Sequence, residues 1–494
     1  MSDPAKLQFA LVSHTNNGKT TLARTLVGID VGEVRDAAHV TAFAQAHVLQ
    51  TTPEGDTLLL WDTPGFGDSV RLLKRLAMAG NPIGWFLREV FDRYRDRTFW
   101  LSQQALRAAR DEADVVLYLV NSSEPPGDAG YLPAEMRILE WLGKPVVVLL
   151  NQLGAPRPAP DEQAEQALWR THLDRYGIVR DVLALDAFAR CWVHEHVFYE
   201  AVAPVVAPDK RAGYARLRTA WAAANLVRYR ASLRVIAAQV AQAARDGEDI
   251  AEHATSLLKS AMKVVRLVSR DERRQDAAMA RLVQRLNDGI AQSTAQLLTL
   301  HRLDPGDAGR INARVRDNFK VRAPLDKTQA GLLGAVVSGA ATGLSADLMA
   351  GGLTLGGGAL LGAIVGALTM AGAAWGFNTT TDRNRPRVEF APAFLRTLLV
   401  GAMLRYLAVA HFGRGRGQFV EGEAPPFWQA AVEDALQARC PDTDGLWRRV
   451  REAREASAAA LPLEDLVGDV LADVFERLYP GSRAVLVPHP AANA

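Results

Sequence analysis

The amino-acid sequence predicts an α/β P-loop nucleotide-binding domain with a mainly parallel sheet, followed by a mostly α-helical C-terminal region that contains a glycine-rich helical hairpin. Through about residue 205, near-continuous apolar runs such as Val115–Val120 and Val146–Leu150 alternate with helical patterns, as strands buried on both faces do. Beyond that point, Ala, Leu and Arg dominate and apolar residues recur at helical spacing. We therefore expect two structural classes in one chain.

A phosphate-binding loop follows the first apolar run, Leu7–Val12. The segment Ser13–Thr20 departs from the pattern G-x-x-x-x-G-K-[ST] at its first residue alone, where a small serine replaces glycine. In such loops, backbone N–H groups and a helix N-terminus bind phosphates, a lysine neutralises charge and a hydroxyl reaches Mg²⁺. Gly18, Lys19 and Thr20 fill these roles.

The run Thr57–Asp62 supports this interpretation because it ends in an acidic residue. Asp62 can reach Mg²⁺ and the N–H of Gly65 can reach a γ-phosphate. Thr41 lies in the polar stretch between the two motifs and would cap Mg²⁺ when that stretch closes. A Gly-Lys-Thr tripeptide alone is often an ordinary helix start, but the second motif favours the phosphate loop.

The nucleotide-binding domain is expected to span residues 1–205, with six strands. The predicted strands cover residues 7–12, 45–50, 57–62, 114–121, 144–151 and 182–185. A helical insertion at 68–111 follows the Asp62–Gly65 motif. It is either a surface that rearranges with the γ-phosphate or, as we favour, a helix packed on the domain with a basic solvated face.

Composition indicates a protein of the cytoplasm. The net charge of +2 gives no basic field for nucleic acid, so no nucleic-acid partner is predicted. The two cysteines, Cys191 and Cys440, suit a reducing compartment, and the first residues are polar. Metal ligands within Cys191–His196 are disfavoured because His194 and His196 lie on different sides of a helix.

The segments Ser13–Thr21 and Asp62–Gly65, with the strand that ends at Asn151, resemble the Era/TrmE-like branch of small GTPases. The likeness is closer to bacterial members that carry a long C-terminal domain of unknown function. It implies GTP and GDP as ligands, Mg²⁺ and K⁺ as cofactors, and an unknown protein effector. The catalytic residues it implies are Lys19, Thr41 and Gly65.

The same resemblance assigns the remaining ligand contacts. The Mg²⁺ ligands it implies are Thr20, Thr41 and Asp62. Asn16 matches an asparagine that helps to hold K⁺ in some members. The nucleotide-binding residues are Asn16, Asn17, Gly18, Lys19, Thr20, Thr21, Asp62, Gly65, Asn151 and Asp186.

Two departures from the family pattern bear on the chemistry. Where those GTPases have N-K-x-D, this chain has Asn151-Gln152-Leu153-Gly154, so the carboxylate that reads guanine is missing at Gly154. Asp186 is a substitute base contact or, more commonly for such a residue, a helix cap. Phe66 stands where signalling GTPases place a water-orienting glutamine, which predicts slow turnover unless a cation, an arginine of 71–110 or a partner assists.

The C-terminal half is expected to contain a long-helix region at 206–327, a glycine-rich hairpin at 328–381 and a further helical region at 382–494. The hairpin carries one charged residue, Asp347, and each half is long enough to cross a bilayer. Basic residues flank it, which suits a hairpin whose ends stay on the cytoplasmic side of a membrane. A tightly packed soluble hairpin is the alternative, because Gly and Ala contribute little transfer free energy.

The leading hypothesis is a slow, Mg²⁺-dependent GTPase coupled to a helical domain that associates with the inner face of a membrane. The second hypothesis is an ATPase or a promiscuous nucleotide hydrolase. Gly154 favours it, because this residue lacks the carboxylate that binds guanine. The third is a nucleotide-gated membrane scaffold with negligible turnover, which Phe66 and the glycine-rich segment favour.

Overall fold

The structure is a computed structural model, and it divides into two compact units. Unit 1 comprises residues 1–227, 410–423 and 475–494, and unit 2 comprises 228–409 and 424–474. The residues that the structure describes are 4–15, 17–27, 45–63, 65–66, 69–77, 100, 103, 106, 109–153, 157–185, 191–249, 264–303, 375–378, 387–411 and 426–486.

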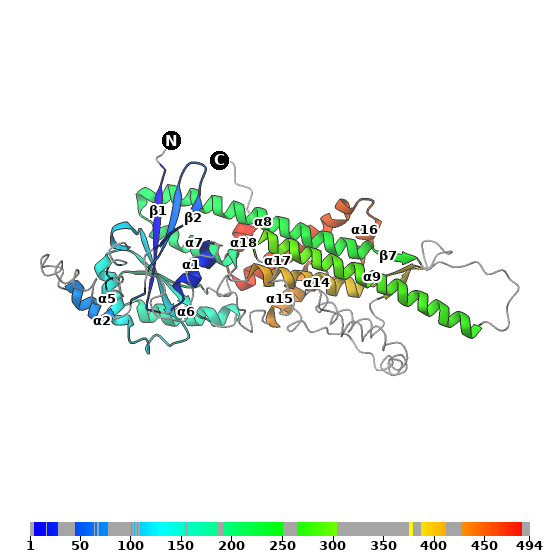
Figure 1. The fold of residues 1–494 in the computed structure, drawn as a ribbon, viewed down its shortest axis with the longest axis horizontal. Coiled ribbons are helices and arrows are strands. Elements are labelled where there is room, and N and C mark those ends of the chain that lie inside the picture. Colours follow the sequence, from blue (N-terminus) through cyan, green and yellow to red (C-terminus); the bar gives the residue numbers. More distant parts are fainter. Residues whose placement is uncertain are drawn as a thin grey trace. The chain divides into compact units, whose positions relative to one another are not determined.

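A six-stranded sheet forms the centre of unit 1 (Figure 1). Its strands are β1 (Lys6–Ser13), β2 (Gln45–Thr51), β3 (Thr57–Asp62), β4 (Val115–Asn121), β5 (Val146–Asn151) and β6 (Val179–Ala184). They lie in the order β2-β3-β1-β4-β5-β6, and every pairing is parallel except that of β2 with β3. The predicted fold class is therefore confirmed, and β6 begins three residues earlier than expected.

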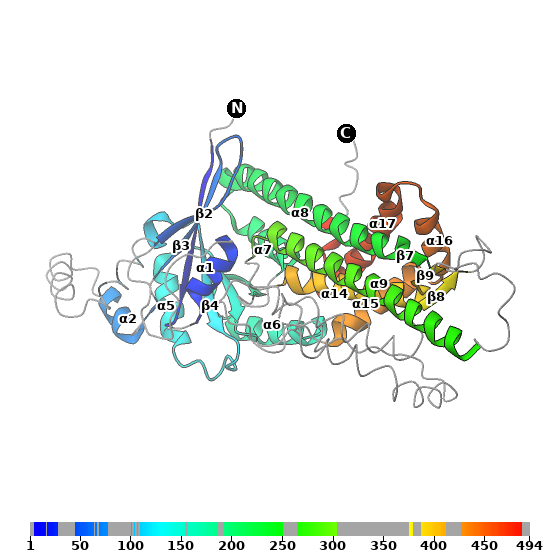
Figure 2. The same cartoon turned by 45° about the vertical axis from the view of Figure 1, so that its right-hand side comes forward.

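The described helices of unit 1 are α1 (Lys19–Val27), α2 (Ser69–Ala77), α5 (Leu132–Leu142), α6 (Ala159–Leu173), α7 (Trp192–Val202), the first part of α8 (Arg211–Arg245) and α18 (Arg483–Leu486). Helices α1, α5 and α6 lie beside the sheet in Figure 2. Strands β4 and β5 are buried almost throughout, which explains their continuous apolar sequence. The carboxyl ends of parallel strands meet at one edge, which is where such sheets bind ligands.

The first turns of α8 are anchored to the opposite end of the sheet. The guanidinium of Arg216 donates to both carboxylate oxygens of Asp56, at 2.6 and 2.7 Å, and the backbone N–H of Ala5 donates to the same carboxylate at 2.8 Å. The hydrogen bond with Arg216 holds the pKa of Asp56 well below its usual range. Lys210 adds an ion pair with Asp114 at 2.7 Å. A polar anchor thus fixes the start of this long helix.

Unit 2 is mainly helical and contains a small three-stranded sheet. Its helices are the remainder of α8, α9 (Val264–Leu300), α14 (Pro392–Ala410), α15 (Pro426–Arg439), α16 (Asp444–Glu452) and most of α17 (Ala456–Leu478). Its strands are β7 (Gly247–Asp249), β9 (Arg387–Phe390) and β8 (Trp375–Asn378), in that spatial order. Helices α8, α9 and α14 run alongside one another in Figures 1 and 2.

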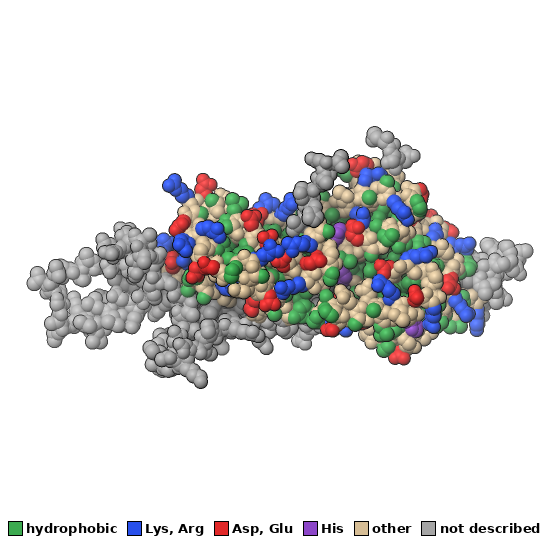
Figure 3. Space-filling view, turned by 180° about the vertical axis from the view of Figure 1, so that it is seen from behind, with side chains coloured by type: hydrophobic (Ala, Val, Ile, Leu, Met, Phe, Trp, Pro, Cys, Tyr) green, Lys and Arg blue, Asp and Glu red, His purple; other side chains and the backbone are tan. Residues whose placement is uncertain are grey.

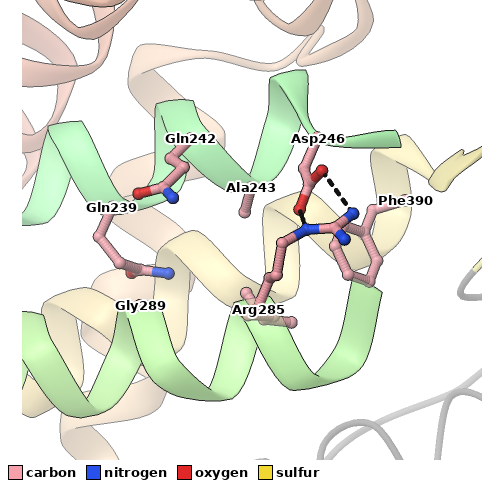
Figure 4. A pocket seen from close by; sticks show the side chains of 8 residues that line it. Gln239, Gln242, Ala243, Asp246, Arg285, Gly289 and Phe390 are labelled. Carbon is pink, nitrogen blue, oxygen red and sulfur yellow. Dashed lines mark hydrogen bonds and ion pairs between the residues drawn. The ribbon is translucent and has the colours of Figure 1, made fainter. Parts of the chain in front are cut away.

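One expectation for this half requires correction. The region 206–327 contains long helices, α8 and α9, as expected, and β7 lies between them. Beside it, Arg285 of α9 donates to both oxygens of Asp246 at 2.8 Å next to a shallow pocket (Figure 4). The end of the expected hairpin differs, because residues 375–378 form β8 and pair with β9 rather than extending a helix. The rest of 328–381 lies outside the described residues.

Within the described residues, one helix, α14, is long and apolar enough to cross a membrane by length and composition. In the structure, 83% of its most apolar window is buried, as is typical of the core helix of a globular unit. Its apolar character therefore has a packing explanation. Elsewhere, acidic and basic side chains are interspersed over the described surface that Figure 3 shows.

Candidate functional site

The loop between β1 and α1 is held by side chains from the neighbouring strands. The Asn151 side-chain amide donates to the Asn17 carbonyl at 2.7 Å, and the Asn17 amide donates to the Leu119 carbonyl at 3.3 Å. Gly18 has φ +84°, and a Cβ there would lie 2.6 Å from Asn151 Nδ2. Glycine is required at this position for both reasons. Strands β4 and β5 thus fix the shape of the phosphate loop.

Lys19 and Gly65 meet at the centre of the site. Lys19 is buried and donates to Ser13 Oγ at 3.0 Å. Burial lowers the pKa of Lys19, while the carboxylates of Asp62 and Glu135 oppose that shift. A Cβ added to Gly65 would lie 3.0 Å from Lys19 Nζ and 2.9 Å from Thr15 Cα. Gly65 therefore packs directly on the phosphate loop.

The two candidate Mg²⁺ ligands with described positions lie together. Thr20 Oγ1 donates to Asp62 Oδ2 at 2.7 Å, and Asp62 is 2% exposed. A hydroxyl and a carboxylate at one point are the hard oxygen donors that Mg²⁺ prefers, so the residues fit this ion. The third predicted ligand, Thr41, lies outside the described residues, as does Asn16, the predicted K⁺ contact.

The segment after β3 returns to the phosphate loop through its backbone. The Phe66 N–H donates to the Ser13 carbonyl at 2.9 Å, and Thr15 Oγ1 donates to the Phe66 carbonyl at 3.0 Å. The Phe66 ring is 1% exposed and belongs to the hydrophobic core. A ring buried in this way anchors the segment, and it offers no polar atom to orient a water molecule.

The described residues include some of the remaining predicted nucleotide contacts. Thr21 is buried within α1, where its carbonyl accepts from Thr25 Oγ1 at 3.0 Å. Gln152, which follows Asn151, has φ +60° at the end of β5. Gly154 and Asp186, on which the identity of the base depends, lie outside the described residues. The structure thus describes the phosphate side of the site more fully than the base side.

A buried carboxylate behind the phosphate loop was missed by the sequence reasoning. Glu135 of α5 is fully buried, and it contacts His14 of the phosphate loop, Ser69 of α2 and Tyr118 of β4. The sequence feature that could have identified this carboxylate lies in Leu132–Leu142. There, Glu135 is on the apolar helix face that Leu132, Met136 and Leu139 define. An acid on the buried face of an amphipathic helix indicates a buried partner.

The cluster Cys191–His196 has a packing role. Cys191 is buried, and the His194 ring stacks on Tyr479 with centroids 4.7 Å apart. No group of three His, Cys, Asp or Glu side chains suited to a metal ion occurs among the described residues.

Two family models match the chain. Residues 170–467 match the model described as Domain of unknown function (DUF3482), which covers more than half of the sequence. The chain belongs to this family. Residues 8–152 match the model described as 50S ribosome-binding GTPase. This segment is thus a P-loop GTPase domain, a class that binds and hydrolyses GTP, joined to the DUF3482 domain. No curated protein matches the sequence.

Solved structures resemble part of the chain. Era in complex with MgGDPNP and a segment of 16S ribosomal RNA is 18% identical, with a TM-score of 0.31, over 41% of this chain and 58% of that one. Era from Aquifex aeolicus bound to GDP and AlF4⁻ is 19% identical, with a TM-score of 0.30, over 41% and 57%. The matched part thus spans little more than half of either Era chain.

A longer alignment links the chain to one of an oligomerised bacterial dynamin pair. It covers 97% of this chain and 70% of that one at 10% identity, with a TM-score of 0.25. The similarity is too low to support an argument about function.

Proposed function

We propose that this protein binds Mg²⁺ and GTP at the loop between β1 and α1 and hydrolyses GTP slowly. The observation that carries the proposal is the convergence of Lys19, Gly65 and the Thr20–Asp62 pair at the end of β1. A cation, a backbone N–H at a glycine and two hard oxygen donors are the groups that a nucleoside triphosphate and its metal require.

Each residue has a role in this proposal. Lys19 neutralises the β- and γ-phosphates, and the Gly65 N–H donates to a γ-phosphate oxygen. Thr20, Asp62 and Thr41 would hold Mg²⁺, which neutralises the charge that develops during phosphoryl transfer. Asn17 and Asn151 keep the loop in the shape that presents its N–H groups.

Slow turnover follows from the position of Phe66. Because its ring is packed in the core and its backbone is bonded to Ser13 and Thr15, this residue cannot supply the group that orients the attacking water. Faster hydrolysis would then require K⁺ beside Asn16, an arginine from 71–110 or a protein partner.

The proposal that the protein prefers guanine nucleotides rests on the match to the GTPase family. In this proposal, Asp186 contacts the guanine base. Asn151 donates to the Asn17 carbonyl, so this amide shapes the loop. The alternative of ATP or promiscuous use is favoured by Gly154, which has no carboxylate to pair with the guanine edge.

Nucleotide binding tests these alternatives. The affinities of the full-length protein for GTP and ATP are measured by titration calorimetry with Mg²⁺, alongside Lys19→Ala and the control Lys6→Ala, whose side chain is exposed. We expect selective GTP binding that Lys19→Ala weakens by about 100-fold, while Lys6→Ala does not. Equal or tighter binding of ATP would contradict the preference for guanine. Binding of GTP without release of phosphate would favour the hypothesis of a nucleotide-gated membrane scaffold with negligible turnover.

We further propose that the segment 328–381 brings the protein to the cytoplasmic face of a membrane, based on its composition. Deleting residues 328–370 retains β8, which pairs with β9. The expected result is loss of the protein from the membrane fraction with unchanged GTP affinity. A full-length protein that is already soluble after gentle lysis would contradict the proposal.

A further inference from the structure

The segment that follows α17 belongs to unit 1 and is held there by a defined turn. Gly481 has φ +90°, and the Glu476 carboxylate accepts from the backbone N–H groups of Gly481 and Arg483, each at 2.8 Å. The Ser482 N–H donates to the Tyr479 carbonyl at 3.0 Å. A carboxylate that accepts from two backbone donors fixes a turn, because hydrogen bonds to a charged group are strong. Tyr479 therefore has a set position in unit 1.

The Tyr479 side chain packs against α7 and against the residue that follows α14. Its ring stacks on the ring of His194, with centroids 4.7 Å apart and 12° between the planes. Its hydroxyl oxygen lies 2.8 Å from Nε2 of His411, which is fully buried. His194 belongs to the first turn of α7, and His411 comes directly after the last residue of α14. Stacking and a hydrogen bond thus fix the ring on two sides.

Tyr479 also lies near the start of α6. Burial raises the pKa of Tyr479 well above its ordinary value, and the Cys191 thiol and the Glu162 carboxylate contribute to this rise. Glu162 belongs to the first turn of α6, where it accepts from the Arg157 N–H at 3.1 Å, and Cys191 directly precedes α7. Because charges influence one another strongly only at short range, one tyrosine lies beside the first turns of two helices.

These two helices follow the strands on the nucleoside side of the candidate site. Helix α6 follows β5, α7 follows β6, and β5 and β6 are neighbours in the sheet. The end of β5 adjoins the phosphate loop, where the Asn151 amide donates to the Asn17 carbonyl. Asp62, at the end of β3, marks the Mg²⁺ side, and β3 lies on the other side of β1. A nucleotide whose phosphates bind at the loop therefore extends along the carboxyl edge of the sheet towards β5 and β6.

We propose that Tyr479 is a positioning residue for the nucleoside half of the bound nucleotide. It holds the first turns of α6 and α7 at a fixed separation, so that the carboxyl ends of β5 and β6 present a preformed surface to the sugar and base. Among the described residues, its contacts lie on α7 and near α6, so it acts on the nucleoside rather than on the phosphates. A segment far along the chain from the phosphate loop thereby completes the nucleotide site. This inference rests on the proposed nucleotide-binding function.

Titration calorimetry of the full-length protein tests this role. GTP and GDP are titrated with Mg²⁺ into the wild type, Tyr479→Leu, which keeps apolar bulk, and Tyr479→Phe, which keeps the ring that stacks on His194. We expect Tyr479→Leu to weaken the binding of both nucleotides by about tenfold, the effect of one aromatic pair, and Tyr479→Phe by about threefold. The control Tyr214→Leu truncates a buried ring that packs on Phe9 in the same unit, and it should bind both nucleotides with wild-type affinity.

Melting temperatures of the nucleotide-free variants separate positioning from general stability. A variant that stays about 90% folded at the assay temperature loses only about 10% of its affinity through unfolding, because the apparent affinity scales with the folded fraction. A tenfold loss in such a variant therefore reports positioning. If Tyr479→Leu fails to fold, His194→Ala removes the stacking partner from α7 and must weaken GTP binding by a similar factor.

Two results would overturn the proposal. The first is wild-type affinity in a folded Tyr479→Leu protein or, where that protein does not fold, in His194→Ala. The second is a fall in turnover at saturating GTP with unchanged affinity, because this would place the effect on the phosphates.

The wild-type titration separates this inference from the proposed function. If the wild type binds neither GTP nor ATP, the proposed function fails and this inference fails with it. If the wild type binds GTP and a folded Tyr479→Leu protein binds it equally well, the inference alone fails. If the wild type prefers ATP, the preference for guanine fails, and the same tenfold loss is expected for ATP and ADP.

Discussion

In unit 1, the buried Glu135 carboxylate contacts three polar side chains, whereas in unit 2 the buried Arg405 guanidinium donates to Gln239 at 3.4 Å. Arg405 is 1% exposed, and none of the described acidic residues lies within ion-pair distance of it. Burial lowers its pKa to about 10. The same physical cost, the desolvation of a charge, is compensated at one site and largely uncompensated at the other.

This difference separates a site built around charge from a unit built around apolar packing. Near the phosphate loop, the buried charges Lys19, Asp62 and Glu135 lie close enough to influence one another. In unit 2, the ion pairs of Arg285 and Arg439 lie near the surface, with side chains 39% and 33% exposed. We infer that charge in unit 1 serves binding, while unit 2 is stabilised mainly by its apolar helices.

The largest effect is expected from Glu135→Leu. The substitution removes the acceptor of Tyr118 and Ser69 and leaves their hydroxyls buried without a partner. We expect the free energy of unfolding to fall by about 3–5 kcal/mol, measured by urea denaturation of the full chain. Glu140→Leu on the exposed face of the same helix is the control. A loss below about 1 kcal/mol would remove the contrast between the two sites.

Arg405→Met in unit 2 is expected to raise the free energy of unfolding, the opposite of the effect of Glu135→Leu. Methionine keeps an unbranched apolar chain and removes a charge whose one polar contact among the described residues is the long hydrogen bond to Gln239. Urea denaturation should show a free energy of unfolding raised by about 1–2 kcal/mol. Arg396→Met, which removes a surface contact with Gln437, should change it little. Marked destabilisation by Arg405→Met would show that the buried charge is compensated after all.

A smaller effect is expected from pH through His301 of unit 2. Burial and the nearby Arg228 lower the pKa of His301 to about 3, below the ordinary value of 6.5. The unfolded chain therefore takes up a proton first as the pH falls, so stability is lost progressively from pH 6.5 towards 3. His301→Phe should remove about 1 kcal/mol of the stability difference between pH 7 and pH 5.5. Equal pH dependence in both proteins would contradict this.

The smallest effect is expected at the anchor of α8. Arg216 is 31% exposed on its side chain, so solvent screens its pairing with Asp56. The pKa of Asp56 is lowered in the folded state, so its stabilisation is present above the ordinary value of 3.8 and is lost as the pH falls further. Asp56→Asn should lower the melting temperature slightly at pH 7, and the difference should shrink below pH 3.8. A constant difference would exclude charge as its cause.

Local sequence was enough to predict the phosphate side of the candidate site. The glycine and lysine of Ser13–Thr20 and the acidic end of β3 were identified from spacing, because both motifs are fixed by short-range backbone geometry. The apolar runs likewise gave the strands of the sheet to within a few residues. The strand β7 between the two long helices was not foreseen, since its pairing with β9 is a long-range contact.

The sequence alone determined the class of the first domain and predicted the residues of its phosphate loop, because strand burial and loop geometry leave local patterns. Only the tertiary structure brought Glu135 to His14 and Ser69, which lie 121 and 66 residues away in the chain. It also placed the apolar α14 within the core of its unit. The physical reason is shared: partners of a buried charge and neighbours of an apolar face are chosen by packing, which no local pattern records.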